Sequence, residues 1–281
     1  MKAKILLDKL FKIVCLIAAG VVLAFLAWIV VDITCKSLPS LSLEVLAELP
    51  KSGGKAGGIL NAIVGSIFIS GLAILIVAPI SLLTSIFIVE YGKPKLIAKA
   101  VSFSSEVLAG IPSIIFGFYG FVVFVLVMRF GLSVLSGALA IAALELPIAI
   151  KASEEALRMV PQSVREASLS LGATRWQTAI KVVTRQALPS LVTANLLAFA
   201  RGMGEAAPLL FTSGYSNFIP SSLWSPSATL PLAVYYLIST PFPEAHARAY
   251  VAAFILIVIV LAINWSTRLL SRRVAKFSVT R

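Results

Sequence analysis

The feature that most constrains this chain is its long stretches of uninterrupted apolar sequence. Of the 281 residues, 59% are hydrophobic and only 13% are charged, and the mean hydropathy is +1.00. Soluble domains carry about 25% charged residues, so an ordinary water-exposed globule is excluded. A helix needs about 20 apolar residues to cross a bilayer. Six runs approach or exceed that length, at about residues 12–35, 59–89, 101–128, 132–151, 188–212 and 247–270.

These runs predict an all-α membrane protein with six transmembrane helices, because the strands of a membrane barrel would alternate apolar and polar residues. Pro79, Pro112 and Pro147 lie inside the runs and predict kinks or breaks. Residues 1–58 are expected to form an N-terminal transmembrane helix and an outside loop. Residues 59–281 are expected to form a five-helix core.

The basic residues are distributed unevenly along the chain, which has a net charge of +12. If both termini face the cytoplasm, most of the 24 Lys and Arg residues lie on that side. This asymmetry is typical of membrane topology, so the charge indicates an N-in/C-in orientation and not nucleic-acid binding. The residues on that side are Lys2, Lys4, Lys9, Lys12, Lys93, Lys95, Lys99, Lys151, Arg158, Arg165, Arg175, Lys181, Arg185, Arg268, Arg272, Arg273, Lys276 and Arg281.

The cytoplasmic loop at about residues 153–187 has the pattern of a docking surface. It reads as two short helices joined by a turn, with expected capping boxes at Ser163/Glu166 and at Thr174/Gln177. Small residues leave a surface shallow enough for the cleft of a partner protein to close around it. The residues expected to form this surface are Glu166, Ala167, Ser168 and Gly172.

A second interpretation of this loop is an amphipathic segment that lies on anionic lipid. Its basic residues Arg158, Arg165, Arg175, Lys181 and Arg185 would favour that contact. Lipid binding alone, however, does not require the spacing of a glutamate, small residues and a glycine. The docking interpretation is therefore preferred.

Charged residues inside a predicted span are the candidates for a transport site. A charge at the bilayer centre costs roughly 2.5–3.5 kcal/mol on insertion scales. Arg201 and Glu205 are four residues apart in the fifth run and are expected to share a face of one helix. Gly202 and Gly204 leave room beside that face for a neighbouring helix or a solute. The guanidinium fork of an arginine suits tetrahedral oxyanions.

A structural alternative for these residues is an Arg–Glu pair that only neutralises itself inside the bundle. Glu106 and Glu145 are weaker candidates for the site. Glu145 precedes Leu146-Pro147. For either glutamate, an alternative role is to satisfy backbone groups freed by a neighbouring proline. No catalytic residue, metal-ligand cluster or ATP site is expected.

Several motifs together resemble the phosphate permeases of binding-protein-dependent type I ABC importers, and the A-type subunit in particular. They are Gly57–Ser66, Gly110–Gly117, Glu145–Pro147, Glu166–Gly172, Arg201–Glu205 and Leu230–Tyr235. Two departures from the family pattern occur in the loop. Ser168 replaces the second alanine of the motif, and Thr184-Arg185 stand in place of a Leu-Pro that follows only at Leu188-Pro189.

The resemblance implies a multi-pass permease of the cell inner membrane that moves phosphate inward by alternating access. Arg201, Gly202, Gly204 and Glu205 would line the translocation path, and Glu166 to Gly172 would couple it to ATP hydrolysis. The implied partners are a C-type permease in a heterodimer, two ATP-binding cassette subunits that bind ATP and Mg²⁺, and an extracytoplasmic phosphate-binding protein. Cofactors in this chain are not expected.

Alternatives remain for the function. The substrate can be another oxyanion, such as sulfate, molybdate or phosphonate. A secondary anion transporter without an ATPase is disfavoured by the loop, and a purely structural subunit leaves Arg201 unexplained.

Overall fold

The computed structural model describes residues 2–92 and 95–275, and nearly all of its regular structure is helical. The strands in this part of the chain, β1 (Pro50–Lys51) and β2 (Ala56–Gly57), form a small antiparallel hairpin. The α-helices are α1 (Lys2–Ser37), α2 (Leu43–Ala47), α3 (Leu60–Ile86), α4 (Lys95–Ala109), α5 (Ser113–Gly120), α6 (Val134–Arg158), α7 (Gln162–Ser170), α8 (Arg175–Gln177), α9 (Thr184–Met203), α10 (Ala207–Thr212), α11 (Leu230–Ile238) and α12 (Pro243–Ala275).

Short helical turns of other types extend or connect these helices. The segments η1 (Leu38–Ser40) and η2 (Ser52–Gly54) are 3₁₀ turns on either side of β1. The segments η3 (Phe87–Tyr91), η4 (Phe121–Val127) and η5 (Thr178–Val183) are π-helical. Helices α3 and α5 therefore end in π turns, and α9 begins after one.

The helices long and apolar enough to cross a membrane are fewer than the six runs in the sequence. Among the described residues they are Lys9–Ser40, Leu60–Tyr91, Val134–Arg158 and Pro243–Leu270, with a possible fifth span formed by a bent pair of helices. The fifth apolar run is divided between α9 and α10, with a break after Met203. The structure is thus a helical membrane protein with four or five candidate spans, and six spans stay a prediction.

Proline breaks one of the three runs in which it was expected to cause a kink or break. The segments Leu96–Ala109 and Ser113–Val127 are bent by 101° relative to each other, and Pro112 lies at the break. Proline lacks the N–H that would continue the helix and restricts the residue before it. By contrast, α3 and α6 contain Pro79 and Pro147 without a break in the helix.

Close helix contacts in the bundle depend on small residues. A Cβ atom on Gly117 of α5 would lie 2.7 Å from the Cα atom of Pro208 in α10. One on Gly120 would lie 3.0 Å from side-chain carbons of Ala140 and Thr212. The glycine face of α5 therefore allows α10 and α6 to approach closely, as is common in membrane helix packing.

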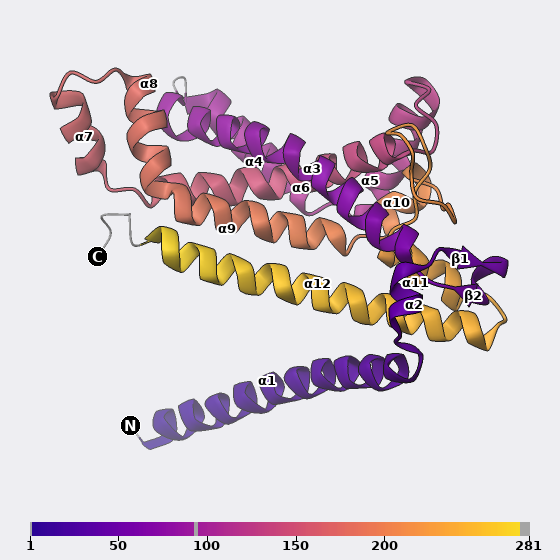
Figure 1. Cartoon of the computed structure of the whole chain (residues 1–281). Helices are drawn as coiled ribbons and strands as arrows, with labels where there is room; N and C mark the ends of the chain where they lie inside the picture. Colours follow the sequence, from indigo (N-terminus) through magenta and orange to yellow (C-terminus); the bar gives the residue numbers. More distant parts are fainter. Residues whose placement is uncertain (1, 93–94, 276–281) are drawn as a thin grey trace.

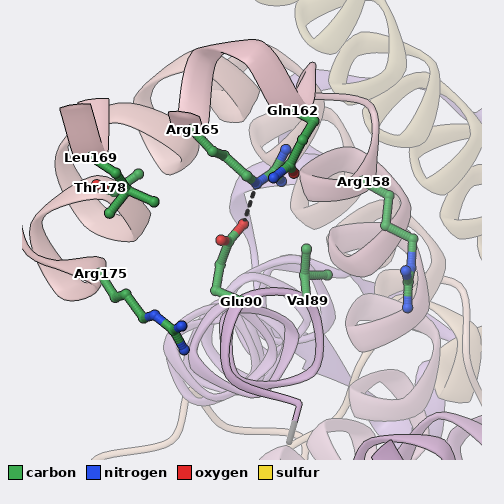
Figure 2. A pocket seen from close by; sticks show the side chains of 8 residues that line it. All are labelled: Val89, Glu90, Arg158, Gln162, Arg165, Leu169, Arg175 and Thr178. Carbon is green, nitrogen blue, oxygen red and sulfur yellow. Dashed lines mark hydrogen bonds and ion pairs between the residues drawn. The ribbon is translucent and has the colours of Figure 1, made fainter. Parts of the chain in front are cut away.

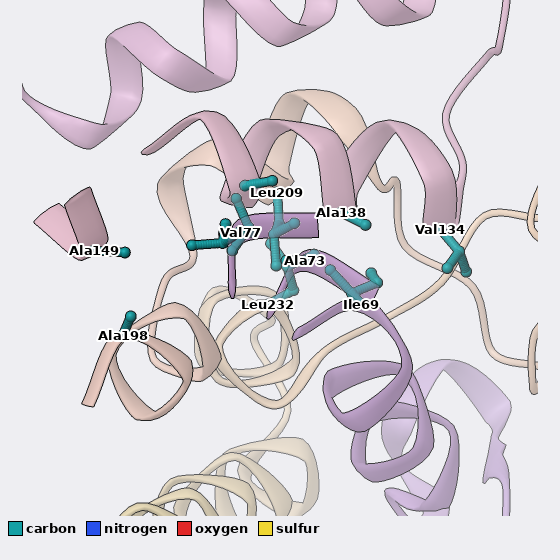
Figure 3. Close-up of a cluster of buried hydrophobic side chains, with 11 residues drawn as sticks. Ile69, Ala73, Val77, Val134, Ala138, Ala149, Ala198, Leu209 and Leu232 are labelled. Atoms are coloured by element: carbon teal, nitrogen blue, oxygen red, sulfur yellow. The ribbon is translucent and has the colours of Figure 1, made fainter. Parts of the chain in front are cut away.

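The main hydrophobic core lies where α3 and α6 pack together (Figure 3). Two thirds (67%) of the most apolar stretch of α6 is buried, whereas none (0%) of the corresponding stretch of α1 is buried. Helix α6 is thus the central helix of the bundle. The core residues are Ile69, Ala73, Val77, Val134, Ala138, Ile141, Ala142, Ala149, Ala198, Leu209 and Leu232.

Helix α1 stands apart from the bundle, and the C-terminal end of α1 contacts α12 (Figure 1). There the ammonium of Lys36 lies 5.1 Å from the ring centre of Tyr250. In the same view α1 begins and α12 ends at the end of the molecule that carries α7 and α8, and the β1–β2 hairpin lies at the opposite end. The division of the chain at residue 58 stays a prediction.

The glycine packing between α5 and α10 leads to a stability prediction. Gly117→Ala should lower the free energy of unfolding by about 1–3 kcal/mol, because the new methyl group overlaps backbone atoms of α10. Gly71→Ala in α3 is the matched control, since no atom lies within 4 Å of its added Cβ. Thermal unfolding of both purified variants in detergent measures the difference. Equal midpoints for the two variants would contradict the close contact.

Candidate functional site

The connection between α6 and α9 forms a projecting loop that consists of α7, a turn and α8 (Figure 1). The turn contains Gly172 with φ +82°, a conformation that favours glycine. The predicted capping box at α8 is confirmed, because Thr174 Oγ1 accepts from the Gln177 backbone N–H and Gln177 Oε1 accepts from the Thr174 N–H. Helix α8 continues through η5 into α9 and is not a separate helix.

The predicted capping box at Ser163 and Glu166 is wrong. Helix α7 begins at Gln162 directly after Pro161, so Ser163 already lies inside the helix. A proline is well suited to the start of a helix, where its fixed φ is favourable and its missing N–H is not needed. The start signal in this segment was therefore Pro161.

Three of the four residues expected on the docking surface are exposed. They are Glu166, Ala167 and Gly172, and no atom lies within 4 Å of a Cβ added to Gly172. Ser168 is half-buried, and its hydroxyl lies 2.9 Å from that of Thr178, which ties α7 to η5. Ser168, which replaces an alanine of the family pattern, thus makes a hydroxyl contact that an alanine could not make.

Apolar side chains on this loop were not singled out from the sequence. Leu171 is 89% exposed, and Leu169 and Trp176 are also exposed. An exposed leucine and tryptophan beside a glycine turn are typical of contact surfaces for other proteins. The signal in the sequence was the apolar residue on each side of the turn at Gly172.

A second group of functional candidates lies where α9 ends against α6. Arg201 is in the last turn of α9, and its Nε lies 3.2 Å from Oε1 of Glu145 in α6. Its Nη2 lies 3.7 Å from Oε1 of Glu205. The structure therefore brings together Arg201 and Glu205, as predicted, and adds Glu145 from 56 residues away.

The group formed by Arg201, Glu145 and Glu205, here called the charged triad, differs sharply in exposure among its members. The side chain of Arg201 is 50% exposed, whereas that of Glu145 is only 3% exposed. Oε2 of Glu145 is buried and has no hydrogen-bond partner among the described residues. Arg201 is thus half-exposed, and it forms an ion pair with a buried carboxylate.

Helix α9 ends before Glu205, so Arg201 and Glu205 lie on the same side of the chain but not within one helix. The helix ends at Met203, and the Gly204 N–H donates to the Arg201 carbonyl. Gly202 is buried against α6, where an added Cβ would lie 3.1 Å from Ile141. This glycine therefore makes room for a neighbouring helix.

Glu106 does not join the charged triad. It forms an ion pair with Lys151, whose Nζ lies 2.7 Å from Glu106 Oε1 and 3.3 Å from Glu154 Oε2. The Ser102 hydroxyl donates to Glu154, which also accepts from Arg158. These residues tie α4 to α6. Within residues 2–92 and 95–275, no three His, Cys, Asp or Glu side chains are grouped so as to hold a metal ion.

A helical membrane bundle with a projecting loop and an embedded charged triad has the features of a transport permease. The family described as "Binding-protein-dependent transport system inner membrane component" matches residues 78–276. The chain belongs to this family. It is therefore a multi-pass permease component of the inner membrane, a transport subunit and not an ATPase.

Individual relatives of this chain include phosphate transport permeases. The chain is 34% identical to the phosphate transport system permease protein PstA of Haemophilus influenzae over 247 residues, which cover 88% of this chain and 87% of that protein. It is 37% identical to the phosphate transport system permease protein PstA 1 of Mycobacterium tuberculosis over 210 residues, which cover 74% of this chain and 69% of that protein.

Solved structures support the fold. A chain from the inward-facing MetNI methionine ABC transporter superposes with a TM-score of 0.59 at 18% identity, over 80% of this chain and 95% of that one. A chain from an amino acid ABC transporter gives a TM-score of 0.56 at 20% identity, over 76% and 93%. The helical arrangement is thus that of ABC importer permeases.

Proposed function

We propose that this chain is the permease subunit of an ATP-driven phosphate importer and forms part of the translocation path by alternating access. The names of its relatives support the substrate, because they are phosphate transport permeases that align with most of this chain. The observation that carries the proposal is the half-exposed Arg201 at the break between α9 and α10. A permanent positive charge in that position calls for a functional explanation.

Arg201 binds the anion through its planar donor fork, which matches the oxygen spacing of a tetrahedral oxyanion. In the empty state Glu145 and Glu205 neutralise the guanidinium. An incoming anion replaces the longer of these contacts, the 3.7 Å pair with Glu205. A phosphate that still carries a proton donates a hydrogen bond to the carboxylate of Glu205, which sulfate at neutral pH does not.

The charge balance of the triad supports a heterodimer. With both carboxylates ionised, one arginine and two glutamates have a net negative charge, which repels an anion. A second positive charge is therefore needed, and a C-type permease partner supplies it with its own arginine across the path. Gly202 and Gly204 position Arg201 beside the path, the first by close packing against α6 and the second by ending α9.

The projecting loop is the docking site for one of the two ATP-binding cassette subunits, which bind ATP and Mg²⁺, and the corresponding loop of the C-type partner takes the other. Exposed Glu166, Ala167 and Gly172, with Leu171 next to the turn, support a contact that excludes water. At the other end of the molecule, the hairpin and the loop that precedes α11 face an extracytoplasmic phosphate-binding protein. A secondary transporter has no use for such a loop, whereas a permease for sulfate, molybdate or phosphonate remains the alternative.

An N-in/C-in orientation with six spans completes the proposal. It is supported by the position of α7 at the same end of the molecule as the start of α1 and the end of α12 (Figure 1). The excess of basic residues in the segments at this end supports the same assignment. The α9–α10 segment then acts as a broken span, with the charged triad at its break.

Cysteine labelling tests this orientation. Ser163 and Ser221 are both exposed, so a cysteine at either position is accessible once the native Cys15 and Cys35 have been replaced. A membrane-impermeant maleimide added from outside should label Ser221→Cys and leave Ser163→Cys unlabelled until the membrane is opened. The reverse pattern would overturn the orientation and the docking assignment together.

A bulky residue at Gly172 tests the docking site. Gly172→Trp should leave the permease in the membrane but reduce ATPase co-purification and phosphate uptake to near background. Gly131→Trp is the control, because Gly131 also has a positive φ (+67°) and open space around its Cβ, but precedes α6 at the opposite end. Both variants carry a similar backbone strain of about 1–2 kcal/mol. Equal ATPase recovery with the two variants would rule out docking at Gly172.

Substitutions of Arg201 test the anion path. Arg201→Lys keeps the charge but loses the fork, so uptake of phosphate into proteoliposomes should fall about tenfold or more while the complex stays assembled. Arg201→Gln should abolish most uptake and also destabilise the subunit, because Glu145 is left buried without its partner.

The double variant Arg201→Gln with Glu145→Gln separates the transport role from a structural one. It removes the buried charge with its partner, so the melting temperature should return toward that of the unaltered chain while uptake stays low. Normal phosphate uptake by this double variant would show that Arg201 only neutralises Glu145. Competition by sulfate, molybdate and phosphonate in the unaltered complex identifies the oxyanion.

A further inference from the structure

Arg165 has a role in the structure that its position in a basic loop does not suggest. Its side chain is buried, although the residue directly precedes exposed Glu166 of the docking surface. Its Nε donates to Oε1 of Glu90 at 2.8 Å, and its Nη2 donates to the Leu157 carbonyl at 2.9 Å. Its Nη1 donates to the Val160 carbonyl. Contrary to the lipid-contact interpretation, this arginine points into the protein.

Both side chains of the Arg165–Glu90 ion pair are largely buried. The two side chains are only 11% and 13% exposed. Exposed ion pairs contribute little because water and salt screen them, whereas a shielded pair that also satisfies backbone carbonyls is a specific and directional contact. Breaking it leaves a largely buried charge without its partner.

This contact joins three elements at the base of the loop. Arg165 is in α7, the carbonyls belong to the end of α6, and Glu90 lies in η3 at the end of α3. A cavity of about 470 Å³ lies beside the pair, between α7 and η3, while Val164 of α7 and Val89 of η3 pack on the same apolar cluster (Figure 2). Among the described residues, the Arg165–Glu90 pair is the polar contact that crosses from α7 to η3.

Helices α3 and α6 both extend from the base of the loop to the charged triad. Helix α6 carries Glu145, twelve residues before Leu157 and thus about 18 Å away along the helix. Helix α3 lines the buried side of Glu145 with Ser70, Ala73 and Val77. A displacement of α7 that reaches both α3 and α6 therefore reaches the residue that holds Arg201.

We propose that the Arg165–Glu90 pair is the strut that transmits movement of the docked loop to α3 and α6, with Arg165 as a positioning residue for coupling. This inference rests on the proposed docking of ATPase subunits at the loop. Without the strut, the open space beside α7 absorbs the displacement, and ATP hydrolysis proceeds without moving the helices that surround the triad. The strut is outside the docking surface, so its loss leaves docking itself intact.

The test uses the assembled complex in proteoliposomes with three single variants. Arg165→Lys keeps the charge but cannot bond Glu90 and two carbonyls at once, and Glu90→Gln removes the charge with little change of shape. Arg158→Lys is the control, because Arg158 lines the same cavity but pairs with Glu154 within its own helix. The measured quantities are ATPase recovery, the rate of ATP hydrolysis, and phosphate transported per ATP hydrolysed.

Both strut variants should retain the ATPase subunits and continue to hydrolyse ATP, while phosphate transported per ATP falls about fivefold or more. The control should keep the ratio of the unaltered complex. Loss of the ATPase from Arg165→Lys would overturn the inference, since Arg165 would then shape the docking surface. An unchanged ratio, or lower thermal stability with an unchanged ratio, would overturn it as well.

A readout independent of the substrate separates this inference from the proposed function. Nitroxide labels at Ser163→Cys in α7 and Leu75→Cys in α3, both exposed positions, report whether the two helices move as one body. In the parent the distance distribution should be the same with and without ATP, and in Glu90→Gln it should change on ATP addition. Identical behaviour in both proteins would overturn the strut alone, whereas absence of phosphate uptake by the unaltered complex would overturn the proposed function alone.

Discussion

The packing of α3 against α6 is the interaction on which the other features of this protein depend. Ile69, Ala73 and Val77 of α3 meet apolar residues of α6 along the buried face, and the contact continues from one end of the bundle to the other. Residues of this contact surround Glu145. Further along, Glu90 in η3 at the end of α3 lies within reach of Arg165. Both charged contacts are therefore supported by the same pair of helices.

The two charged contacts show how an apolar bundle tolerates ionised groups. In each, a glutamate with little exposure faces an arginine that comes from a different helix. The two arginines differ in whether any of their nitrogens remain available to bind another partner. Arg165 uses all of its nitrogens within the protein, whereas Arg201 is half-exposed and keeps donors for another partner. One is suited to hold helices together and the other to bind an anion.

The features that could be predicted from the sequence are those decided by neighbouring residues. Long apolar runs predicted a helical membrane protein, Pro112 predicted a break, and Thr174 with Gln177 predicted a helix start. Each depends on the local backbone or on helix periodicity. The resemblance in the loop and around Arg201 likewise led to the correct family.

The features that the sequence did not predict depend on contacts between distant segments. Glu145 and Arg201 are 56 residues apart, and Glu90 and Arg165 are 75 apart, so no periodic pattern connects them. Arg165 has the same local appearance as the exposed basic residues around it. The end of α9 at Met203 was missed although the sequence carries two signals for it: Gly204 stands at the C-cap, and Pro208 in the same run cannot continue a helix.

The distance along the chain between Glu145 and Arg201 also has a consequence for how the protein is made. At about 5–20 residues per second, a ribosome needs roughly 3–11 s to add the 56 residues that separate them. During that interval Glu145 has been synthesised but its arginine has not. The residues of α3 that surround its buried side are already present, so α6 can find its packing partner before its charge is paired. The carboxyl group of Glu145 therefore spends its first seconds without Arg201.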